Sequence, residues 1–403
     1  MPAPLFTAAG HFDRDANLFD GRFPLPTAVL IEQSLQHNIE LMSRYCSSHS
    51  VLLAPHGKTT MCEEIIRRQL AAGAWAITVA TAWQAKVVAT MGVRRILLAN
   101  ELVDRGSIRL IAGVLRDVPD LELYCYVDSN DGLALIIEGC PAELLARVRI
   151  LVELGVQGGR TGLRADGDAL LLGRRVAEGP SGLHGFAAFE GILDGGELDS
   201  TLGLVDGLID RLESVATAAQ RNGLYATHEP IVTLGGSAYF DRVVRRLPAD
   251  LAGLGIRIVL RSGCYVTHDS GSYQKVSPLD QRSAGGDRLR PALEVWAAVL
   301  SRPEPGLAIV GLGRRDVSAD AGLPIPRLIR SRSGVLTEPD PTWDTVAIND
   351  QHLYLRLSPD ATLAVGDLIG FGISHPCTTF DKWRSIPLVD AEYTMTGVAT
   401  TQF

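Results

Sequence analysis

The feature that most constrains the fold is an alternation of two patterns between about residues 27 and 261. One pattern is a short apolar run rich in strand-forming residues, and the other is a longer stretch with apolar residues three or four positions apart. Leu35, Ile39 and Met42, for example, fall on one helical face. Helices between strands imply parallel pairing with both sheet faces covered, which predicts an α/β fold. The strand-like runs are Thr27–Ile31, Val51–Ala54, Trp75–Val79, Arg95–Leu98, Leu121–Val127, Val148–Leu154, Leu183–Ala188, Ile231–Leu234 and Ile256–Leu260.

Eight or nine strand–helix units over about 235 residues fit a (β/α)8 TIM barrel, with a doubly wound open sheet as the alternative. Because nine runs are one too many, one of them is an extra strand or belongs to another domain. After about Thr267, prolines and glycines become denser and helical periodicity fades. The runs there are Ala292–Leu300, Gly306–Val310, His352–Leu357 and Leu388–Val398. We therefore predict a barrel over residues 25–266 and a β-rich domain from residues 1–24 and 267–403.

The composition narrows the classes of partner and location. The chain has 403 residues and a formal net charge of −8, so we expect no overall attraction to nucleic acid or to an anionic membrane. No uncharged stretch reaches the length of a bilayer span, and the first 23 residues show no signal-peptide pattern. The six cysteines are scattered and include no CxxC pair. We therefore expect a cytoplasmic protein without a disulfide framework.

Chemistry that needs a primary amine has few candidates, because the chain contains only four lysines: Lys58, Lys86, Lys275 and Lys382. Lys58 stands in Pro55-His56-Gly57-Lys58-Thr59-Thr60, directly after a predicted strand, where barrel enzymes place their active sites. Gly57 allows a sharp turn that can aim the amine into the barrel mouth. Desolvation there would lower the pKa of the lysine and make it nucleophilic. The alternative is an ordinary solvated loop lysine.

Two short polar loops follow the last two predicted barrel strands. Gly235-Gly236-Ser237 follows one strand, and Gly263-Cys264-Tyr265 follows the other after two residues. Backbone N–H groups in such loops can bind a phosphate, and late strands are the usual phosphate position in these barrels. Opposite a strand-end lysine, the two loops predict pyridoxal phosphate as cofactor. Each loop alone is equally typical of a common Gly-Ser turn.

Further candidates follow other strands or lie near the C-terminus. Arg160, in a glycine-rich loop after Val148–Leu154, could hold a phenolate or a carboxylate with two hydrogen bonds. Glu190 could act as an acid or base, or bond a ring nitrogen. His375 and Cys377 offer an imidazole and a thiolate, which suit zinc. The alternatives are solvated loop residues and a buried cysteine beside an unrelated histidine.

The motifs, in their order along the chain, resemble the D-serine dehydratase / D-threonine aldolase-like family. Its members are fold type III pyridoxal phosphate enzymes with an alanine racemase-type barrel, and the likeness is strongest to members labelled amino acid deaminase. It covers about Phe23 to Trp383, in the segments PHGKTTMCEEI, GRTG, GGSAYFD, RSGCYVTHD, GRRDVSADAGLP, NDQH and GISHPCTTFDKW.

The resemblance implies a role for each matching residue. Lys58, in a His-x-Lys motif with His56, would form the Schiff base with pyridoxal 5′-phosphate, and Arg160 would face the cofactor ring. A divalent metal would bind to His375 and Cys377. The phosphate would be held by Gly235, Gly236, Ser237, Gly263, Cys264 and Tyr265.

The same resemblance implies an activity and leaves alternatives. The metal pair is His-x-Cys in dehydratase-like members, whereas aldolase-like members have Asp as the second ligand; Cys377 therefore favours a dehydratase, and zinc over Mn²⁺ or Mg²⁺. Phe189 replaces an expected tyrosine, so the partner of the ring nitrogen stays open.

The implied reaction converts a D-3-hydroxy-amino acid, such as D-serine, D-threonine or 3-hydroxyaspartate, to a 2-oxo acid and ammonia. Retro-aldol cleavage to glycine and an aldehyde is the alternative, because one fold can serve both reactions. A racemase and a non-catalytic pyridoxal-phosphate-binding protein are less favoured. The resemblance also implies a homodimer.

Overall fold

The computed structural model describes residues 15–247, 251–283 and 285–403, and the chain in it divides into two compact units. The barrel unit comprises residues 42–61 and 66–263, and the β-rich unit comprises the residues before 42, residues 62–65 and the residues from 264 onward. Residues 1–14, which the sequence analysis assigns to the β-rich domain, lie outside the described residues. None of the helices in the described ranges is both long enough and apolar enough to cross a lipid bilayer.

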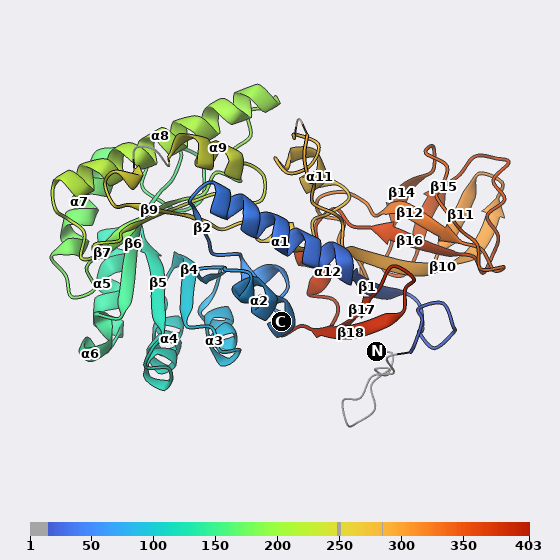
Figure 1. Cartoon of the computed structure of the whole chain (residues 1–403), viewed down its shortest axis with the longest axis horizontal. Coiled ribbons are helices and arrows are strands. Elements are labelled where there is room, and N and C mark those ends of the chain that lie inside the picture. The colour runs from blue at the N-terminus through green and yellow to red at the C-terminus, as the bar shows by residue number, and fades with distance from the viewer. Residues whose placement is uncertain (1–14, 248–250, 284) are drawn as a thin grey trace. The chain divides into compact units, whose positions relative to one another are not determined.

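The barrel unit is built on eight parallel strands with helices around them (Figure 1). Their order is β2-β9-β8-β7-β6-β5-β4-β3. The N–H group of Trp75 donates to the carbonyl of Leu53 over 2.7 Å, and that of Thr78 donates to the carbonyl of Pro55 over 2.9 Å. These bonds join β3 to β2, so the sheet closes and the predicted (β/α)8 barrel is confirmed. The strands are β2 (Leu52–Leu53), β3 (Ile77–Val79), β4 (Arg95–Glu101), β5 (Glu122–Val127), β6 (Val148–Leu154), β7 (Leu183–Ala188), β8 (Ile231–Thr233) and β9 (Arg257–Leu260).

Helices alternate with these strands along the chain, and several begin at a side chain that caps them. Thr81, Asp104 and Ser129 each accept a backbone N–H from the first turn of the helix that follows. Local sequence therefore sets where these helices begin. The helices are α2 (Glu63–Ala71), α3 (Ala82–Thr90), α4 (Arg105–Asp117), α5 (Asn130–Gly139), α6 (Ala142–Leu145), α7 (Asp166–Ala177), α8 (Leu198–Arg221) and α9 (Phe240–Arg246).

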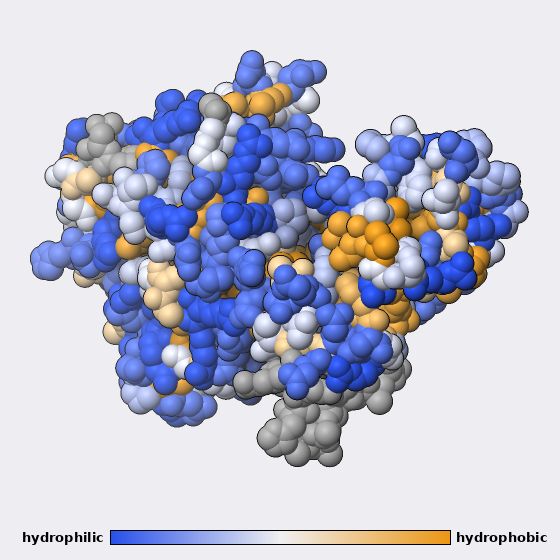
Figure 2. All heavy atoms as spheres, turned by 45° about the vertical axis from the view of Figure 1, so that its right-hand side comes forward, coloured by the Kyte–Doolittle hydropathy of each residue, from blue (hydrophilic) through white to orange (hydrophobic). Residues whose placement is uncertain are grey.

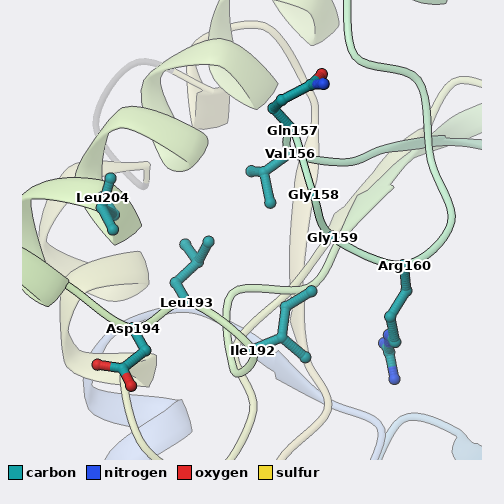
Figure 3. Close-up of a pocket in the computed structure, with 9 residues that line it drawn as sticks. All are labelled: Val156, Gln157, Gly158, Gly159, Arg160, Ile192, Leu193, Asp194 and Leu204. Carbon is teal, nitrogen blue, oxygen red and sulfur yellow. The ribbon is translucent and has the colours of Figure 1, made fainter. Parts of the chain in front are cut away.

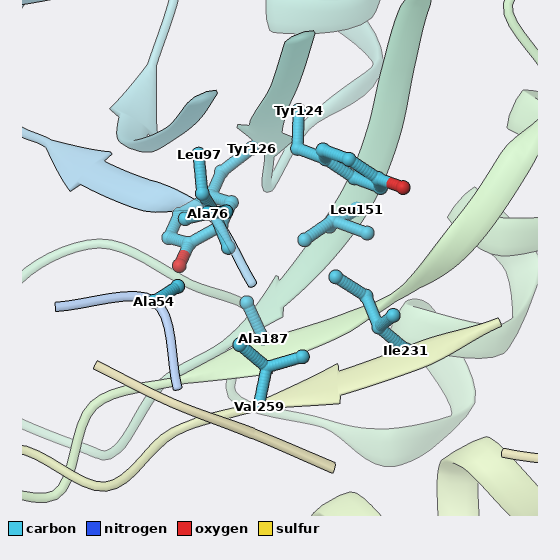
Figure 4. Close-up of a cluster of buried hydrophobic side chains, with 9 residues drawn as sticks. All are labelled: Ala54, Ala76, Leu97, Tyr124, Tyr126, Leu151, Ala187, Ile231 and Val259. Carbon is cyan, nitrogen blue, oxygen red and sulfur yellow. The ribbon is translucent and has the colours of Figure 1, made fainter. Parts of the chain in front are cut away.

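The barrel interior is filled by side chains that its strand segments point inward (Figure 4). Because successive residues of a strand point to opposite faces, the residue two positions further along also faces inward. In β6 and β9 these next residues are Glu153 and Arg261, which are 4% and 6% exposed. A layer of polar side chains therefore lies above the apolar one at the C-terminal ends of the strands. The apolar layer consists of Ala54, Ala76, Leu97, Tyr124, Tyr126, Leu151, Ala187, Ile231 and Val259.

The β-rich unit is one sheet of ten strands. Its main path is β13-β12-β16-β10-β1-β17-β18; β11 also pairs with β10, and β15 joins β11 to β14. All pairs are antiparallel except β1 with β17. The strands are β1 (Thr27–Ile31), β10 (Leu293–Glu304), β11 (Leu307–Val310), β12 (Ile325–Arg330), β13 (Leu336–Thr337), β14 (Asp344–Ile348), β15 (Leu353–Arg356), β16 (Leu368–Gly372), β17 (Ser385–Val389) and β18 (Met395–Thr400).

Two strand assignments differ from the sequence analysis. The run Thr27–Ile31, counted among the barrel strands, is β1 and pairs with β10 and β17. It is the surplus ninth run, and a buried strand between two neighbours has the same apolar pattern in either sheet. The predicted strand Leu388–Val398 is two strands, β17 and β18, joined by a turn at whose end Tyr393 has a φ of 62°.

The remaining elements connect these strands. Helix α1 (Glu32–Ser48) follows β1, and Leu35, Ile39 and Met42 are buried on one face of it, as their spacing predicts. The short segments are η1 (Gly57–Thr59), η2 (Cys264–Val266), α11 (Ser272–Val276) and α12 (Cys377–Phe380).

The β-rich unit exposes a set of large apolar side chains, which Figure 2 colours orange where they reach the visible surface. Each is between 42% and 57% exposed. They are Leu300, Val335, Leu336, Val346 and Val365.

Candidate active site

Lys58 lies where the sequence places it, in the turn that follows β2. The segment Gly57–Thr59 forms the 3-10 turn η1, and the Lys58 side chain is exposed. Position 57 needs a glycine because a Cβ atom there would lie 2.8 Å from Cγ2 of Ile77. The turn therefore packs closely against β3 while the lysine amine stays accessible at the C-terminal end of the barrel.

His56, beside Lys58, is surrounded by positive charge. Burial lowers the pKa of His56 well below its usual value, and the charges of Lys58, Arg261 and Arg160 lower it further. Its Nδ1 atom is buried and has no hydrogen-bond partner among the described residues. A neutral imidazole among three cations is typical of a site that binds an anionic ligand.

Arg261 is a site residue that the sequence analysis passed over. Its guanidinium donates to Oγ1 of Thr233 over 2.8 Å and to the carbonyl of Ala188 over 2.7 Å, and its carbon lies 5.9 Å from the centre of the Tyr126 ring. Both of these acceptors are neutral, so they leave the charge of the buried arginine available to a ligand. Side chains alternate between the two faces of a strand, and Val259 in β9 points into the barrel. Arg261, two residues further along, is therefore expected to point inward as well, and this pattern could have identified it.

Gly263 brings the loop after β9 against the lysine loop. A Cβ atom at this position would lie 2.8 Å from both Cβ of His56 and Oγ1 of Thr59. Only glycine allows this close approach. The predicted phosphate residue Gly263 is therefore adjacent to the His-x-Lys turn, and Cys264 and Tyr265, which follow it in the chain, are both buried.

The other predicted phosphate loop is already engaged by Glu190. One carboxylate oxygen of Glu190 accepts the N–H of Gly235 over 3.0 Å, and the other accepts the N–H of Gly236 over 2.5 Å. Glu190 is fully buried. These two N–H groups are therefore already bonded in this structure, and Glu190 holds the loop through them. Ser237 lies in the turn that precedes α9.

Replacing Glu190 with alanine should lower the stability of the barrel unit markedly. The buried N–H group of Gly235 and the partly buried one of Gly236 would lose their acceptor, at about 1–3 kcal/mol each, so the free energy of unfolding should fall by roughly 2–6 kcal/mol. Denaturant unfolding measures the change. Glu178→Ala, an exposed carboxylate at the end of α7, is the matched control and should change stability by less than about 0.5 kcal/mol. Equal effects of the two substitutions would contradict this role of Glu190.

Arg160 lies in the loop after β6, and its guanidinium stacks on Phe189. The guanidinium carbon is 4.6 Å from the centre of the phenyl ring. The same loop borders a pocket of about 620 Å³ (Figure 3). Its apolar walls include Ile192, Leu193 and Leu204, and Arg160 extends away from them. Phe189, which stands where a tyrosine was expected, therefore contacts Arg160 through its ring.

The predicted metal pair belongs to the β-rich unit. His375 and Cys377 lie between β16 and the start of α12, and the Nδ1 atom of His375 is 2.7 Å from a carboxylate oxygen of Asp320. The hydrogen bond with Cys377 raises the pKa of His375 to about 9, against burial, and Asp320 adds to the effect. With Nδ1 bound to Asp320, the other ring nitrogen can face a metal. Asp320, in the quoted motif GRRDVSADAGLP, is a further residue that the sequence analysis did not assign.

The thiol of Cys264 is the nearest described sulfur to this pair, because its Sγ atom is 3.4 Å from Sγ of Cys377. Its side chain therefore faces the metal pair, so any contribution to phosphate binding would come from its backbone. Among the described residues, no cluster of three or more His, Cys, Asp or Glu side chains is arranged to hold a metal ion. A cation at His375 and Cys377 would therefore need further ligands from water or substrate.

The chain is similar to known proteins in both its sequence and its fold. Residues 292–389 match a family model described as "Putative serine dehydratase domain". A D-threonine aldolase from Arthrobacter sp. is 26% identical over 375 residues, which are 91% of this chain and 89% of that protein. A D-threo-3-hydroxyaspartate dehydratase from Delftia sp. (strain HT23) is 29% identical over 307 residues, 74% of this chain and 73% of that protein. The resemblance that the motifs carry is confirmed.

Solved structures show the same fold. The D-threonine aldolase from Filomicrobium marinum superposes with a TM-score of 0.77 at 24% identity, over 94% of this chain and 95% of that one. An alanine racemase-like protein from Idiomarina loihiensis gives a TM-score of 0.74 at 16% identity, over 96% and 99% of the two chains. A D-threo-3-hydroxyaspartate dehydratase mutant described as metal-free gives 0.72 at 22% identity, over 94% and 98%. The alanine racemase-like architecture is therefore confirmed.

Proposed function

We propose that the chain is a pyridoxal-phosphate-dependent lyase that acts on D-amino acids with a β-hydroxyl group, and that its main reaction is elimination to a 2-oxo acid and ammonia. The observation that carries this proposal is the group of cations at the C-terminal end of the barrel. The positive charges of Lys58, Arg160 and Arg261 each lower the pKa of His56 there. Such a group fits a cofactor that bears a phosphate, a phenolate and an aldehyde.

The described residues fit pyridoxal phosphate with one adjustment to the predicted site. Lys58 supplies an exposed amine, Arg160 a cation for the phenolate, and the segment from Gly263 the close backbone approach that a phosphate needs. Gly235 and Gly236 act indirectly, through their bonds to Glu190. Arg261, between Thr233 and Ala188, is the basic group that could face the ring nitrogen in place of Glu190.

The proposed chemistry divides between the cofactor and the chain. When bound, the cofactor supplies an electron sink for the charge that develops at the α-carbon. Lys58 would hold the cofactor through its amine and would supply the base for the α-proton. A divalent cation, zinc by preference, would be held by His375 and Cys377 and would polarise the β-hydroxyl that leaves. Asp320 orients the imidazole of His375 for this role.

Four observations support the finer assignments. Cys377, where an aspartate would suit an aldolase, favours zinc and elimination. A metal-free form of a dehydratase with this fold supports the use of a metal. The exposed apolar side chains of the β-rich unit, Val335 and Val346 among them, support a homodimer, which light scattering of the purified chain would test. None of the six cysteines, all of which lie in the described ranges, forms a disulfide bond, which supports a cytoplasmic location.

Retro-aldol cleavage to glycine and an aldehyde is the second candidate function. It is favoured by the match to the Arthrobacter D-threonine aldolase, which covers 91% of this chain. Both reactions start from the same substrates and differ in whether the α-proton or the hydroxyl proton is removed.

The assay that decides is incubation of the purified chain with cofactor, zinc and one of D-serine, D-threonine or D-3-hydroxyaspartate. We expect a 2-oxo acid and ammonia in equal amounts. Glycine with an aldehyde would establish the aldolase reaction instead. The L-enantiomer as sole product would indicate a racemase, and no product from any of the three would contradict a lyase of this class.

A further inference from the structure

Two glutamates on strands that flank β5 form a pair that the proposed reaction does not use. Glu101 ends β4, opposite Tyr126 on β5, and Glu153 points inward from β6. Glu153 is 4% exposed. Both carboxylate oxygens of Glu101 and one of Glu153 are buried without a donor among the described residues. Two ionised carboxylates without donors are very costly in such a place.

The surrounding groups do not neutralise both carboxylates. Asp128, after β5, adds negative charge and uses one of its oxygens to accept the N–H of Gly162. Tyr126 is a neutral phenol whose hydroxyl is buried and has no partner within the described ranges, and its pKa is raised mainly by burial. The thiol of Cys125, which the charge of Glu101 also affects, has a pKa raised to about 12 by burial. Arg261 and Arg160 affect this group through their positive charges, which lower the pKa of Tyr126.

We propose that Glu101 and Glu153 share one proton at neutral pH, and that this buried pair limits the negative charge that faces the cofactor site. The proton is bound to one carboxyl group, which donates a hydrogen bond to the other. This hydrogen bond gives each of the two groups one partner. Tyr126 links the pair to the site, because its phenol responds to both glutamates and to Arg160 and Arg261. Loss of the proton would add a second negative charge close to those arginines. The second half of this inference rests on the proposed function.

The protonation of this pair sets the direction in which the stability of the folded chain changes with pH. Burial, together with the nearby carboxyl group of Glu153 and the charge of Asp128, raises the pKa of Glu101 to about 8, from 4.5 for an ordinary glutamate. Between these values the folded chain keeps a proton that the unfolded chain has lost. Stability from this site is therefore full below pH 4.5 and falls as the pH rises to about 8. The titration belongs to the two carboxyl groups together.

The first test uses the chain without cofactor and compares it with Glu101→Gln and Glu153→Gln. Each substitution keeps a donor–acceptor pair and removes the titration. We expect the melting temperature of each variant to exceed that of the parent by an amount that grows from pH 5 to pH 9. Glu138→Gln, which changes an exposed carboxylate on α5 in the same way, should show a constant difference.

A second measurement uses the unmodified chain and therefore does not depend on whether the variants fold. Infrared spectra of the unmodified chain should show the carbonyl stretch of a protonated carboxyl group at pH 7 that disappears in mildly alkaline solution. No such band, together with pH-independent differences in melting temperature, would overturn the shared proton and leave the proposed function untouched.

The second test measures the charge effect on a ligand that cannot react with Lys58. Pyridoxine 5′-phosphate carries the phosphate and the ring but no aldehyde. From pH 7 to pH 9 its affinity for the parent chain should fall roughly tenfold more than its affinity for Glu101→Gln, since loss of the proton adds one negative charge near an anionic ligand. Parallel pH profiles would overturn the role of the pair at the cofactor site. No binding to either chain at any pH would instead count against the proposed function.

Discussion

Replacing Lys58 with alanine should abolish the visible absorption band of lysine-bound pyridoxal phosphate and lower kcat by about 10²–10⁴-fold. Lys58 is exposed at the end of β2, in the turn that Gly57 packs against β3. It is one of only four lysines in the chain. An absorption spectrum of the reconstituted variant and a single-turnover assay measure the two effects.

The matched control is Lys86→Ala. Lys86 is exposed on α3, where its amine lies 5.7 Å from the centre of the Trp83 ring, and it should be replaceable without change to the spectrum. Borohydride reduction followed by peptide mapping should place the covalent cofactor on the peptide that contains Lys58. A normal band in Lys58→Ala, or a label on Lys275 or Lys382, would show that the assignment is wrong.

Removing the divalent cation should have the second largest effect. Treatment with EDTA should abolish lyase activity, and zinc should restore it, because the β-hydroxyl is a poor leaving group without a Lewis acid. His375→Ala and Cys377→Ala should each lose the bound metal, as measured by elemental analysis. Asp320→Asn should weaken zinc affinity roughly 10–100-fold, since it removes the carboxylate that orients His375.

His352→Ala is the control for the histidine substitution. His352 is an exposed histidine of the same β-rich unit, and its replacement should leave the metal content unchanged. Full activity after exhaustive chelation would contradict the metal role. Loss of zinc from His352→Ala as well would show that the metal loss reflects damage to the unit rather than loss of a ligand.

The barrel could be predicted well because its strands are buried on both faces. Runs such as Val148–Leu154 and Leu183–Ala188 have the bounds that the apolar pattern predicts. The short strands of the β-rich unit were harder. β12, β13, β14 and β16 were not predicted, because much of β13 and β14 is exposed and β16 contains two glycines, so no clear run stands out. These strands form because they pair with segments that lie far away in the sequence.

The candidate site was predicted unevenly for a related reason. A lysine after a strand, or a His-x-Cys pair, is visible in the order of residues. The bonds of Glu190 to Gly235 and Gly236 join residues 45 and 46 positions apart, and no local pattern contains them. The pair of Glu101 and Glu153 was not predicted for the same reason, since in the sequence each glutamate looks like an ordinary carboxylate near the end of a strand.

By itself the sequence determined the barrel and pointed to Lys58 and to the two proposed metal ligands, because periodicity, scarcity and spacing are properties of the chain order. Only the tertiary structure decided which sheet Thr27–Ile31 joins and which groups neutralise which charges. Strand pairing and burial depend on contacts between distant segments. A buried carboxylate such as Glu190 has the partners, and therefore the role, that those contacts give it.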